Sequence, residues 1–223
     1  SKIVRLDIKK KGQHIAYIEG AGDVVPESLR QIGYTVVILK PEDISAEHLK
    51  RFDAVVVGIR AYNTVEELKF KQQLLFDYVN QGGNMIVQYN TNRRLKVDQL
   101  APFDLKLSRD RVTDEFAEVR LLAADHEVLN RPNKITTADF DGWTQERGLY
   151  FPNEWSNEFT AILSMNDKDE SPKSGSLLVA KYGKGYYVYT GLSFFREFPA
   201  GVSGAYRLFA NMLSLGKNED SAS

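Results

Sequence analysis

Four short apolar runs, each followed by a helix signal or a turn, occupy the first 90 residues of the chain. The runs at 13–19, 34–39, 54–58 and 84–88 predict strands, and the third of them (Ala-Val-Val-Val-Gly) is apolar without interruption. Uninterrupted apolar strands are typical of sheets that are covered on both faces. A repeated strand–helix order favours a parallel sheet with right-handed crossovers. This part of the chain therefore predicts a doubly wound α/β domain.

Boundary residues predict the helices between these strands. Pro26 opens the first helix, and Ser45 caps a short second one. Thr64 and Glu67 form a Thr-x-x-Glu capping box that predicts the start of a third helix. The glycine pair at 82–83 ends it. The loops after consecutive parallel strands are then expected to meet at one edge of the sheet.

The second half of the chain predicts strands without long helices between them. A Tyr-Gly-Lys-Gly string at 182–185 is a hairpin signal. We expect these strands to extend the sheet in the antiparallel sense, with a closing helix at 204–215. One domain over residues 1–216 is predicted, with residues 217–223 as a disordered tail. The later strands are predicted at 118–122, 159–165, 175–182 and 185–190.

Composition argues against several classes of partner. The formal net charge is -1, so no global field favours nucleic acid or an anionic membrane. No apolar stretch approaches the ~20 residues that a membrane-spanning helix needs. The chain has no cysteine, which excludes disulfides and thiolate metal sites. His14, His48 and His126 lie far apart in the sequence, so no metal site is expected. No cofactor is expected either, because Gly20-Ala-Gly22 lacks the third glycine of a dinucleotide-binding fingerprint.

Motifs in the later half carry a family resemblance. They include Asp139-Phe-Asp-Gly-Trp143, Tyr182-Gly-Lys-Gly185, Tyr189-Thr-Gly-Leu192 and Gly204-Ala-Tyr-Arg-Leu-Phe-Ala-Asn211. With the N-terminal pattern, they resemble the class I glutamine-amidotransferase-like (ThuA-like) region at the C-terminal end of bacterial PIG-L (LmbE-like) deacetylase polypeptides. The resemblance implies a flavodoxin-like α/β fold with an antiparallel C-terminal extension. It also implies an exported parent polypeptide that acts with zinc on N-acetylated sugars, so the expected partners are a carbohydrate and the deacetylase domain.

The resemblance contrasts with the chemistry that the chain offers. This scaffold normally carries a cysteine nucleophile on a tight turn after a central strand, and the corresponding turn here is Gln88-Tyr-Asn-Thr-Asn92. An amide cannot serve as the nucleophile of acyl transfer. A cysteine-dependent amidotransferase is therefore excluded, and no residue of the domain is assigned a catalytic role.

Polar side chains that follow the predicted strands form the first candidate binding site. In open α/β sheets, ligands bind at the carboxyl ends of the strands, and arginine there suits carboxylates or sugar hydroxyls. Alternatively, the same residues make turns and cap helices, as Asn63 could for the predicted third helix. The strand-end candidates are Glu19, Arg60, Tyr62, Asn90, Asn92 and Arg93.

Carboxylates among aromatic side chains at 139–155 form the second candidate. Sugar sites stack rings and use carboxylates to bind hydroxyls or to perform acid–base catalysis. We expect this segment to fold as a loop over the strand ends and to line the same cleft. The alternative is a structural loop with an internal ion pair. The candidates are Trp143, Glu146 and Arg147, with Arg196 from a second aromatic loop.

Together these observations favour a non-catalytic accessory domain that binds carbohydrate or packs on a deacetylase domain. Two other hypotheses stay open: a carbohydrate-active enzyme that uses carboxylates from residues 139–154, and a protein–protein scaffold without a ligand. The isolated Asp125-His126-Glu127 string favours a structural turn over a metal site.

Overall fold

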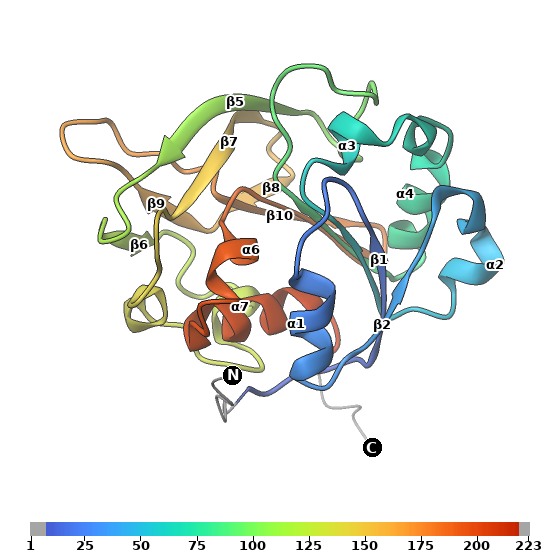
Figure 1. The fold of residues 1–223 in the computed structure, drawn as a ribbon, viewed down its shortest axis with the longest axis horizontal. Helices are drawn as coiled ribbons and strands as arrows, with labels where there is room; N and C mark the ends of the chain where they lie inside the picture. Colours follow the sequence, from blue (N-terminus) through green and yellow to red (C-terminus); the bar gives the residue numbers. More distant parts are fainter. Residues whose placement is uncertain (1–7, 219–223) are drawn as a thin grey trace.

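A seven-stranded sheet forms the centre of the computed structural model, which describes residues 8–218 (Figure 1). The strand order is β2-β1-β3-β4-β11-β10-β8. The first five strands in this order run parallel, and β10 runs antiparallel to both of its neighbours. The predicted α/β sheet with an antiparallel extension is confirmed. The strands are β1 (His14–Ile18), β2 (Thr35–Ile38), β3 (Ala54–Val57), β4 (Asn84–Gln88), β8 (Phe159–Ala161), β10 (Leu177–Tyr182) and β11 (Gly185–Thr190).

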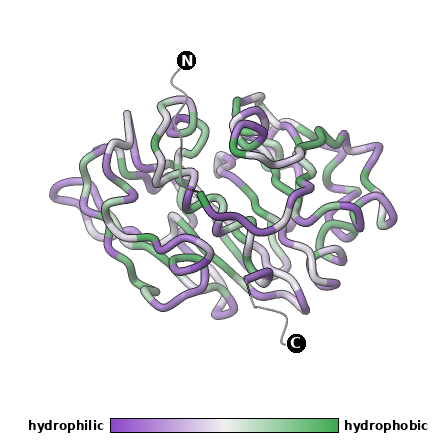
Figure 2. The backbone as a smooth tube through the Cα atoms, turned by 90° about the horizontal axis from the view of Figure 1, so that it is seen from below, coloured by the Kyte–Doolittle hydropathy of each residue, from purple (hydrophilic) through white to green (hydrophobic). Residues whose placement is uncertain are grey.

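Helices cover both faces of the sheet. Alternate side chains of β1 point to opposite faces, so Ile15 and Tyr17 join the apolar cluster of α1 and α7, whereas Ala16 and Ile18 join that of α2 and α4. Hydrophobic segments accordingly gather in the interior, and hydrophilic loops lie at the periphery (Figure 2). The helices are α1 (Val25–Gln31), α2 (Ala46–Leu49), α3 (Ala61–Thr64), α4 (Gln72–Asn80), α5 (Glu127–Asn130), α6 (Phe194–Glu197) and α7 (Ser203–Leu213), with 3₁₀ helices η1 (Pro41–Asp43), η2 (Glu66–Phe70) and η3 (Thr137–Phe140).

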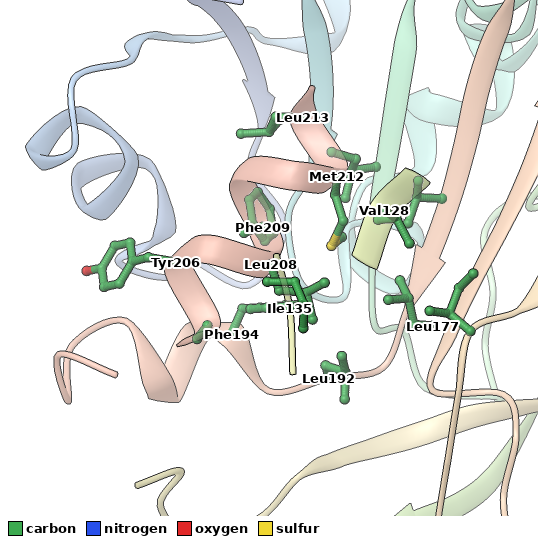
Figure 3. Packing of buried hydrophobic residues seen from close by; sticks show 14 of the residues in the cluster. Val128, Ile135, Leu177, Leu192, Phe194, Tyr206, Leu208, Phe209, Met212 and Leu213 are labelled. Atoms are coloured by element: carbon green, nitrogen blue, oxygen red, sulfur yellow. The ribbon is translucent and has the colours of Figure 1, made fainter. Parts of the chain in front are cut away.

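Helix α7 is almost entirely buried. Phe209 and Met212 point into the cluster that also holds Leu177 of β10 (Figure 3). The fully buried Asn211 donates hydrogen bonds to the carbonyls of Val128 (2.8 Å) and Asn133 (2.7 Å). Helix α7 therefore ties the irregular segment around α5 to the sheet.

A two-stranded ribbon outside the main sheet corrects the prediction of a loop at 139–155. Strand β7 (Gly148–Trp155) pairs antiparallel with β5 (Leu105–Val112). Sequence reasoning missed β5 because only Leu107 and Val112 of its side chains are buried. It missed β7 because Pro152 argues against a strand and because the register shifts along the ribbon. Figure 1 shows the ribbon and α3 at the upper edge of the molecule.

The predicted strand at 159–165 is split into two. Its first part is β8, and its second part, β9 (Leu163–Met165), pairs with β6 (Val119–Leu121) in a separate two-stranded sheet. The hairpin predicted at 182–185 is confirmed by the pairing of Tyr182 with Gly185. The cap predicted at Ser45 is also present, since its side chain accepts a hydrogen bond from the His48 N–H.

The predicted start of the third helix at Thr64 is wrong, although the helix itself is present as α4. Thr64 is the last residue of α3, and its hydroxyl donates to the Arg60 carbonyl (3.0 Å) instead of capping a new helix. The long helix α4 begins only at Gln72. At the other end of the chain, Asn218 donates to the Ser214 carbonyl (3.1 Å), while residues 219–223 of the predicted tail lie outside the described residues. No helix of the described part is long and apolar enough to cross a membrane.

Candidate functional site

The loop after β3 turns sharply at Arg60, which adopts a left-handed backbone conformation (φ 58°) and precedes α3. Its N–H donates to the Tyr89 carbonyl of the neighbouring β4 loop (2.8 Å). Asn63 of α3 accepts from the Thr91 N–H (2.8 Å) and donates to the Arg93 carbonyl (3.1 Å). Asn63 thus binds the loop after β4 and does not cap a helix.

Asn90 stands directly after β4, where the resemblance places a cysteine nucleophile. Its side chain is 0% exposed. Its Oδ1 accepts from the Tyr62 N–H (3.0 Å), its Nδ2 donates to the Gln88 carbonyl (3.1 Å), and its N–H donates to Tyr189 Oη (3.0 Å). The segment between Asn90 and the start of β5 is irregular and contains no helix. The residue is a buried structural amide that offers no nucleophile to a ligand.

Two pockets that share lining residues lie at and beside the carboxyl ends of the strands; together we call them the strand-end pocket, and each one a lobe. One lobe has a volume of about 460 Å³ and the other about 470 Å³. Arg109 of β5 and Tyr150 of β7 line both lobes, so the ribbon forms the shared wall. The first lobe is also lined by Arg60, Asn63, Thr91, Asn92, Arg93 and Arg94, and the second by Arg111, Glu146 and Leu149.

Positive charge dominates this pocket. Its lining includes five arginines and a single carboxylate, Glu146. That carboxylate is already paired, because Arg196 Nε donates to Glu146 Oε1 at 2.5 Å. Within residues 8–218, none of the five lining arginines has an acidic partner within 4.0 Å. The lining therefore holds guanidinium groups that are available to an anion.

Tyr150 lines the pocket, and further aromatic rings pack behind it. The rings of Tyr89 and Tyr150 stack nearly parallel (interplanar angle 10°, centroids 6.2 Å apart), and Phe195 packs against Tyr89 at 5.4 Å. The guanidinium of Arg196 lies over the Phe195 ring at 4.9 Å. Burial raises the pKa of Tyr89, with Arg60 and Arg196 acting in the opposite direction, so its hydroxyl is neutral at physiological pH. Tyr150 is the ring that the pocket exposes to a ligand.

Backbone strain is concentrated at the pocket. Five non-glycine residues of the described chain have positive φ, and three of them line the pocket: Arg60 (58°), Arg94 (58°) and Tyr150 (51°). Such conformations cost an L-residue about 1–2 kcal/mol, and they cluster at ligand sites more than elsewhere. At Arg60 the strained turn is held by hydrogen bonds, because its N–H donates to the Tyr89 carbonyl and its own carbonyl accepts from the Thr64 hydroxyl.

The structure brings together four of the predicted site residues. Arg60, Asn92 and Arg93 line the first lobe, and Glu146 lines the second. Arg196 lies behind them as the partner of Glu146. We expected residues 139–155 to fold back as a loop and to line the cleft. Glu146 and Tyr150 of this segment do line the pocket, but residues 148–155 form strand β7 of the ribbon.

The other predicted site residues lie elsewhere, which corrects their expected position at the cleft. Tyr62 and Asn90 are 0% exposed and lie below the pocket, because both face the packed interior between α3 and the sheet. Trp143 is 2% exposed, with its ring against Phe140 and Phe194. Glu19 is exposed but does not line the pocket.

Arg147 is also a structural residue. It is 5% exposed, and its guanidinium donates to the carbonyls of Phe140 and Ala117 (2.8 Å for the latter). Burial lowers the pKa of this guanidinium, although nearby acids raise it. The neighbouring Glu197 is fully buried and accepts from the Thr144 N–H (2.6 Å) and Ser193 Oγ (2.9 Å). These groups fix the 140–147 segment under the pocket.

Sequence reasoning missed the arginines that lie beyond the strand ends. Arg94, Arg109 and Arg111 line the pocket together with Tyr150. A signal was present, because Arg109 and Arg111 are two residues apart and therefore share one face of a strand. That signal required β5 to be recognised as a strand first.

The Asp125-His126-Glu127 string has a structural role. The His126 ring Nδ1 accepts from the Val128 N–H (3.0 Å) and so caps α5. Glu127 lies 3.9 Å from Arg131 and accepts from the Gly216 N–H. No cluster of three or more potential metal-ligating side chains occurs in residues 8–218.

Comparison with known proteins identifies the fold. No family model and no curated protein matches the chain by sequence. Among solved structures, a cytoplasmic protein of Salmonella typhimurium LT2 is 13% identical with a TM-score of 0.59, and the match covers 93% of this chain and 100% of that one. A protein from Thermoplasma acidophilum that is named for GMP synthase is 12% identical with a TM-score of 0.57, and the match covers 94% of this chain and 96% of that one.

A β-galactosidase from Bacillus circulans is similar over only part of its length. It is 11% identical with a TM-score of 0.55, and the match covers 96% of this chain but 32% of that enzyme. Together with the arrangement of the sheet, these likenesses define a class I glutamine-amidotransferase-type α/β fold. At these identities, the likeness extends to the fold alone.

Proposed function

We propose that this chain is a non-catalytic accessory domain of the class I amidotransferase-like type that binds carbohydrate in the strand-end pocket. One observation carries the proposal. The position that would hold a nucleophile is filled by the buried Asn90, while an open pocket lined by the Tyr150 ring lies directly beside it. The scaffold thus offers a binding site at the edge where ligands of α/β sheets bind, and no acyl-transfer chemistry.

The wider context supports a role beside a carbohydrate-acting enzyme. The motifs of the later half resemble the region attached to PIG-L (LmbE-like) deacetylases, whose substrates are N-acetylated sugars. The similar β-galactosidase, whose name denotes action on galactosides, contains this fold as about a third of its chain. We therefore propose that the domain serves a deacetylase in the same, exported polypeptide, by holding the glycan or by packing on the enzyme.

The carboxylates at 139–154 favour binding over catalysis. Asp139 is held by Arg207 at 3.0 Å and takes part in the capping box of η3. Glu146 is paired with Arg196. Asp141 and Glu154 are exposed and do not line the pocket. A glycosidase needs two carboxyl groups about 5–9.5 Å apart across one bond, and the pocket presents only one.

A glycan array with the purified chain tests this proposal. We expect the unaltered protein to retain a subset of glycans and Tyr150→Ala to lose them, because the ring that supports the sugar is removed. Phe116→Ala is the matched control, since Phe116 is 80% exposed and does not line the pocket. Absence of any bound glycan, or equal binding by Tyr150→Ala, would refute the proposal and leave a scaffold role.

A further inference from the structure

We infer that the strand-end pocket selects acidic sugars, with a ring carboxylate bound by its arginines and the ring face placed on Tyr150. This inference rests on the proposed carbohydrate binding and names the class of sugar. Four features of the pocket support it: the local excess of positive charge, the fixed backbone at several of the arginines, the neutral groups beside them, and the bounded size of the cavity.

The positive charge is a local property of the pocket. The whole chain has 29 basic and 30 acidic side chains, so its net charge is -1. The pocket lining nevertheless contains five arginines against one carboxylate, and that carboxylate is paired with Arg196 outside the lining. Like charges that are placed together repel one another, and all five lining arginines are exposed. A bound anion removes this repulsion, so the pocket is complementary to negative charge.

The backbone that carries several of the arginines is also held in place. Arg60 and Arg94 stand at left-handed backbone positions, and the Asn63 side chain fixes the segment from Thr91 to Arg93 by hydrogen bonds. Arg109 faces them from β5 and lines both lobes. A planar guanidinium matches the two oxygens of a carboxylate, and such charge-assisted bonds are about twice as strong as neutral ones. The arrangement therefore suits a carboxylate at the junction of the two lobes.

The neutral groups of the pocket indicate that the ligand is more than a simple anion. Asn63, Thr91 and Asn92 line the first lobe beside the arginines. Amide and hydroxyl groups can donate to and accept from sugar hydroxyls. The Tyr150 ring, stacked on Tyr89, offers an apolar face to the C–H side of a pyranose. An inorganic phosphate would use the arginines and leave these groups without a function.

The size of the pocket distinguishes an acidic sugar from nucleic acid. Each lobe, at about 460–470 Å³, falls within the range of small-ligand pockets, which is about 300–1,000 Å³. Proteins that bind single strands instead use long basic grooves covering about 4–16 nucleotides. The two lobes are bounded pockets and do not form such a long groove. A unit of one or two sugar residues is the occupant that this cavity fits.

Calorimetric titration with matched oligosaccharides tests the inference. Trigalacturonate is titrated against galactotriose, inorganic phosphate and a short single-stranded oligonucleotide, each at low and at physiological salt. We expect trigalacturonate to bind at least tenfold more tightly than galactotriose, with an affinity that falls as salt screens the exposed guanidinium groups. Arg109→Ala should weaken trigalacturonate binding by about tenfold or more, as expected for the loss of a hydrogen bond to a charged group.

Control variants separate the pocket from general charge effects. Arg51→Ala removes an exposed arginine outside the pocket and should leave the affinity unchanged. Arg93→Ala repeats the test from a different loop and should weaken binding like Arg109→Ala. Unfolding curves of each variant should match that of the unaltered protein, because the substituted side chains are exposed.

Each remaining outcome overturns the inference. Equal affinity for trigalacturonate and galactotriose, with Tyr150→Ala weakening both, would show that the pocket binds sugars without selecting charge. The inference about acidic sugars would then fail, while the proposed carbohydrate binding would hold. Phosphate or the oligonucleotide binding as tightly as trigalacturonate would show a general anion site. Binding of neither sugar would overturn both proposals together.

Discussion

At the scale of single residues, Asn90 marks the difference between this chain and a cysteine-dependent enzyme of the same fold. Its amide joins the loops after β3 and β4 through Tyr62 and also binds Gln88 and Tyr189. Because all of these contacts are buried, the residue stabilises the edge of the sheet that carries the pocket. Its role is structural, and its removal should be measurable as a loss of stability.

Asn90→Ala should therefore lower the free energy of unfolding. The Tyr62 N–H would lose its acceptor in a buried site, which costs about 1–3 kcal/mol. Urea denaturation followed by circular dichroism measures this loss. Ammonia release from glutamine should equal a protein-free blank before and after the substitution. Glutamine hydrolysis by the unaltered chain that disappears in Asn90→Ala would contradict a structural role.

Glu197 provides a second test at this scale. Burial raises the pKa of its carboxyl, and hydrogen bonds from Thr144 and Ser193 only partly oppose the effect. The folded protein then holds this proton more tightly than the unfolded chain does. The contribution of Glu197 to the free energy of unfolding is therefore largest at low pH. It falls as the pH rises from the ordinary glutamate pKa of about 4.3 through the raised pKa of the folded protein.

Glu197→Gln removes this titration while keeping the size of the side chain. We expect the free energy of unfolding of the glutamine variant, relative to the unaltered protein, to increase between pH 4 and pH 7. Comparing the two proteins at each pH cancels the contribution of the other titrating groups. A relative stability that decreases over this range would show that the folded protein prefers the charged carboxylate.

At the scale of elements, the N-terminal strands and α1 follow from local signals, whereas the β5–β7 ribbon does not. The apolar runs of β1, β3 and β4 are buried on both faces, so their composition alone predicts them. In strand β5, exposed charged side chains alternate with buried or half-buried ones. The strand is defined by its antiparallel pairing with β7 and not by an apolar run. Elements that depend on a distant partner are the ones that sequence reasoning missed.

The contact between α7 and η3 gives a prediction at this scale. A glycine-to-alanine change within a helix normally stabilises by about 0.5–1 kcal/mol. At Gly204, however, a Cβ would lie 1.8 Å from the Asp139 carbonyl oxygen. Gly204→Ala should therefore destabilise by about 2 kcal/mol or more, because backbone must move to make space.

Thermal and chemical denaturation of Gly204→Ala measure this effect. Ser203→Ala is the control, since Ser203 is the exposed first residue of the same helix, and it should change stability by no more than about 0.5 kcal/mol. Equal or greater stability of Gly204→Ala would mean that α7 does not pack closely on η3.

At the scale of the whole molecule, the fold class was predictable and the pocket was predictable only in part. Arg60 and Arg93 follow strands of a parallel sheet, so the general rule for strand ends placed them at the site. Arg109 and Tyr150 reach the same pocket through the ribbon, whose pairing joins segments that are far apart in the sequence. No local pattern encodes that juxtaposition, and it supplies the wall on which the proposed ligand recognition depends.

The central claim is that the strand-end pocket binds an acidic sugar without chemistry, and amide resonances of the ¹⁵N-labelled chain test it most directly. On titration with trigalacturonate, we predict shift changes concentrated at Arg60, Asn92, Arg109 and Tyr150, with the sugar recovered intact at the end. Galactotriose at the same concentration should give smaller changes at the same residues. Shift changes centred elsewhere, or a cleaved sugar, would contradict the account.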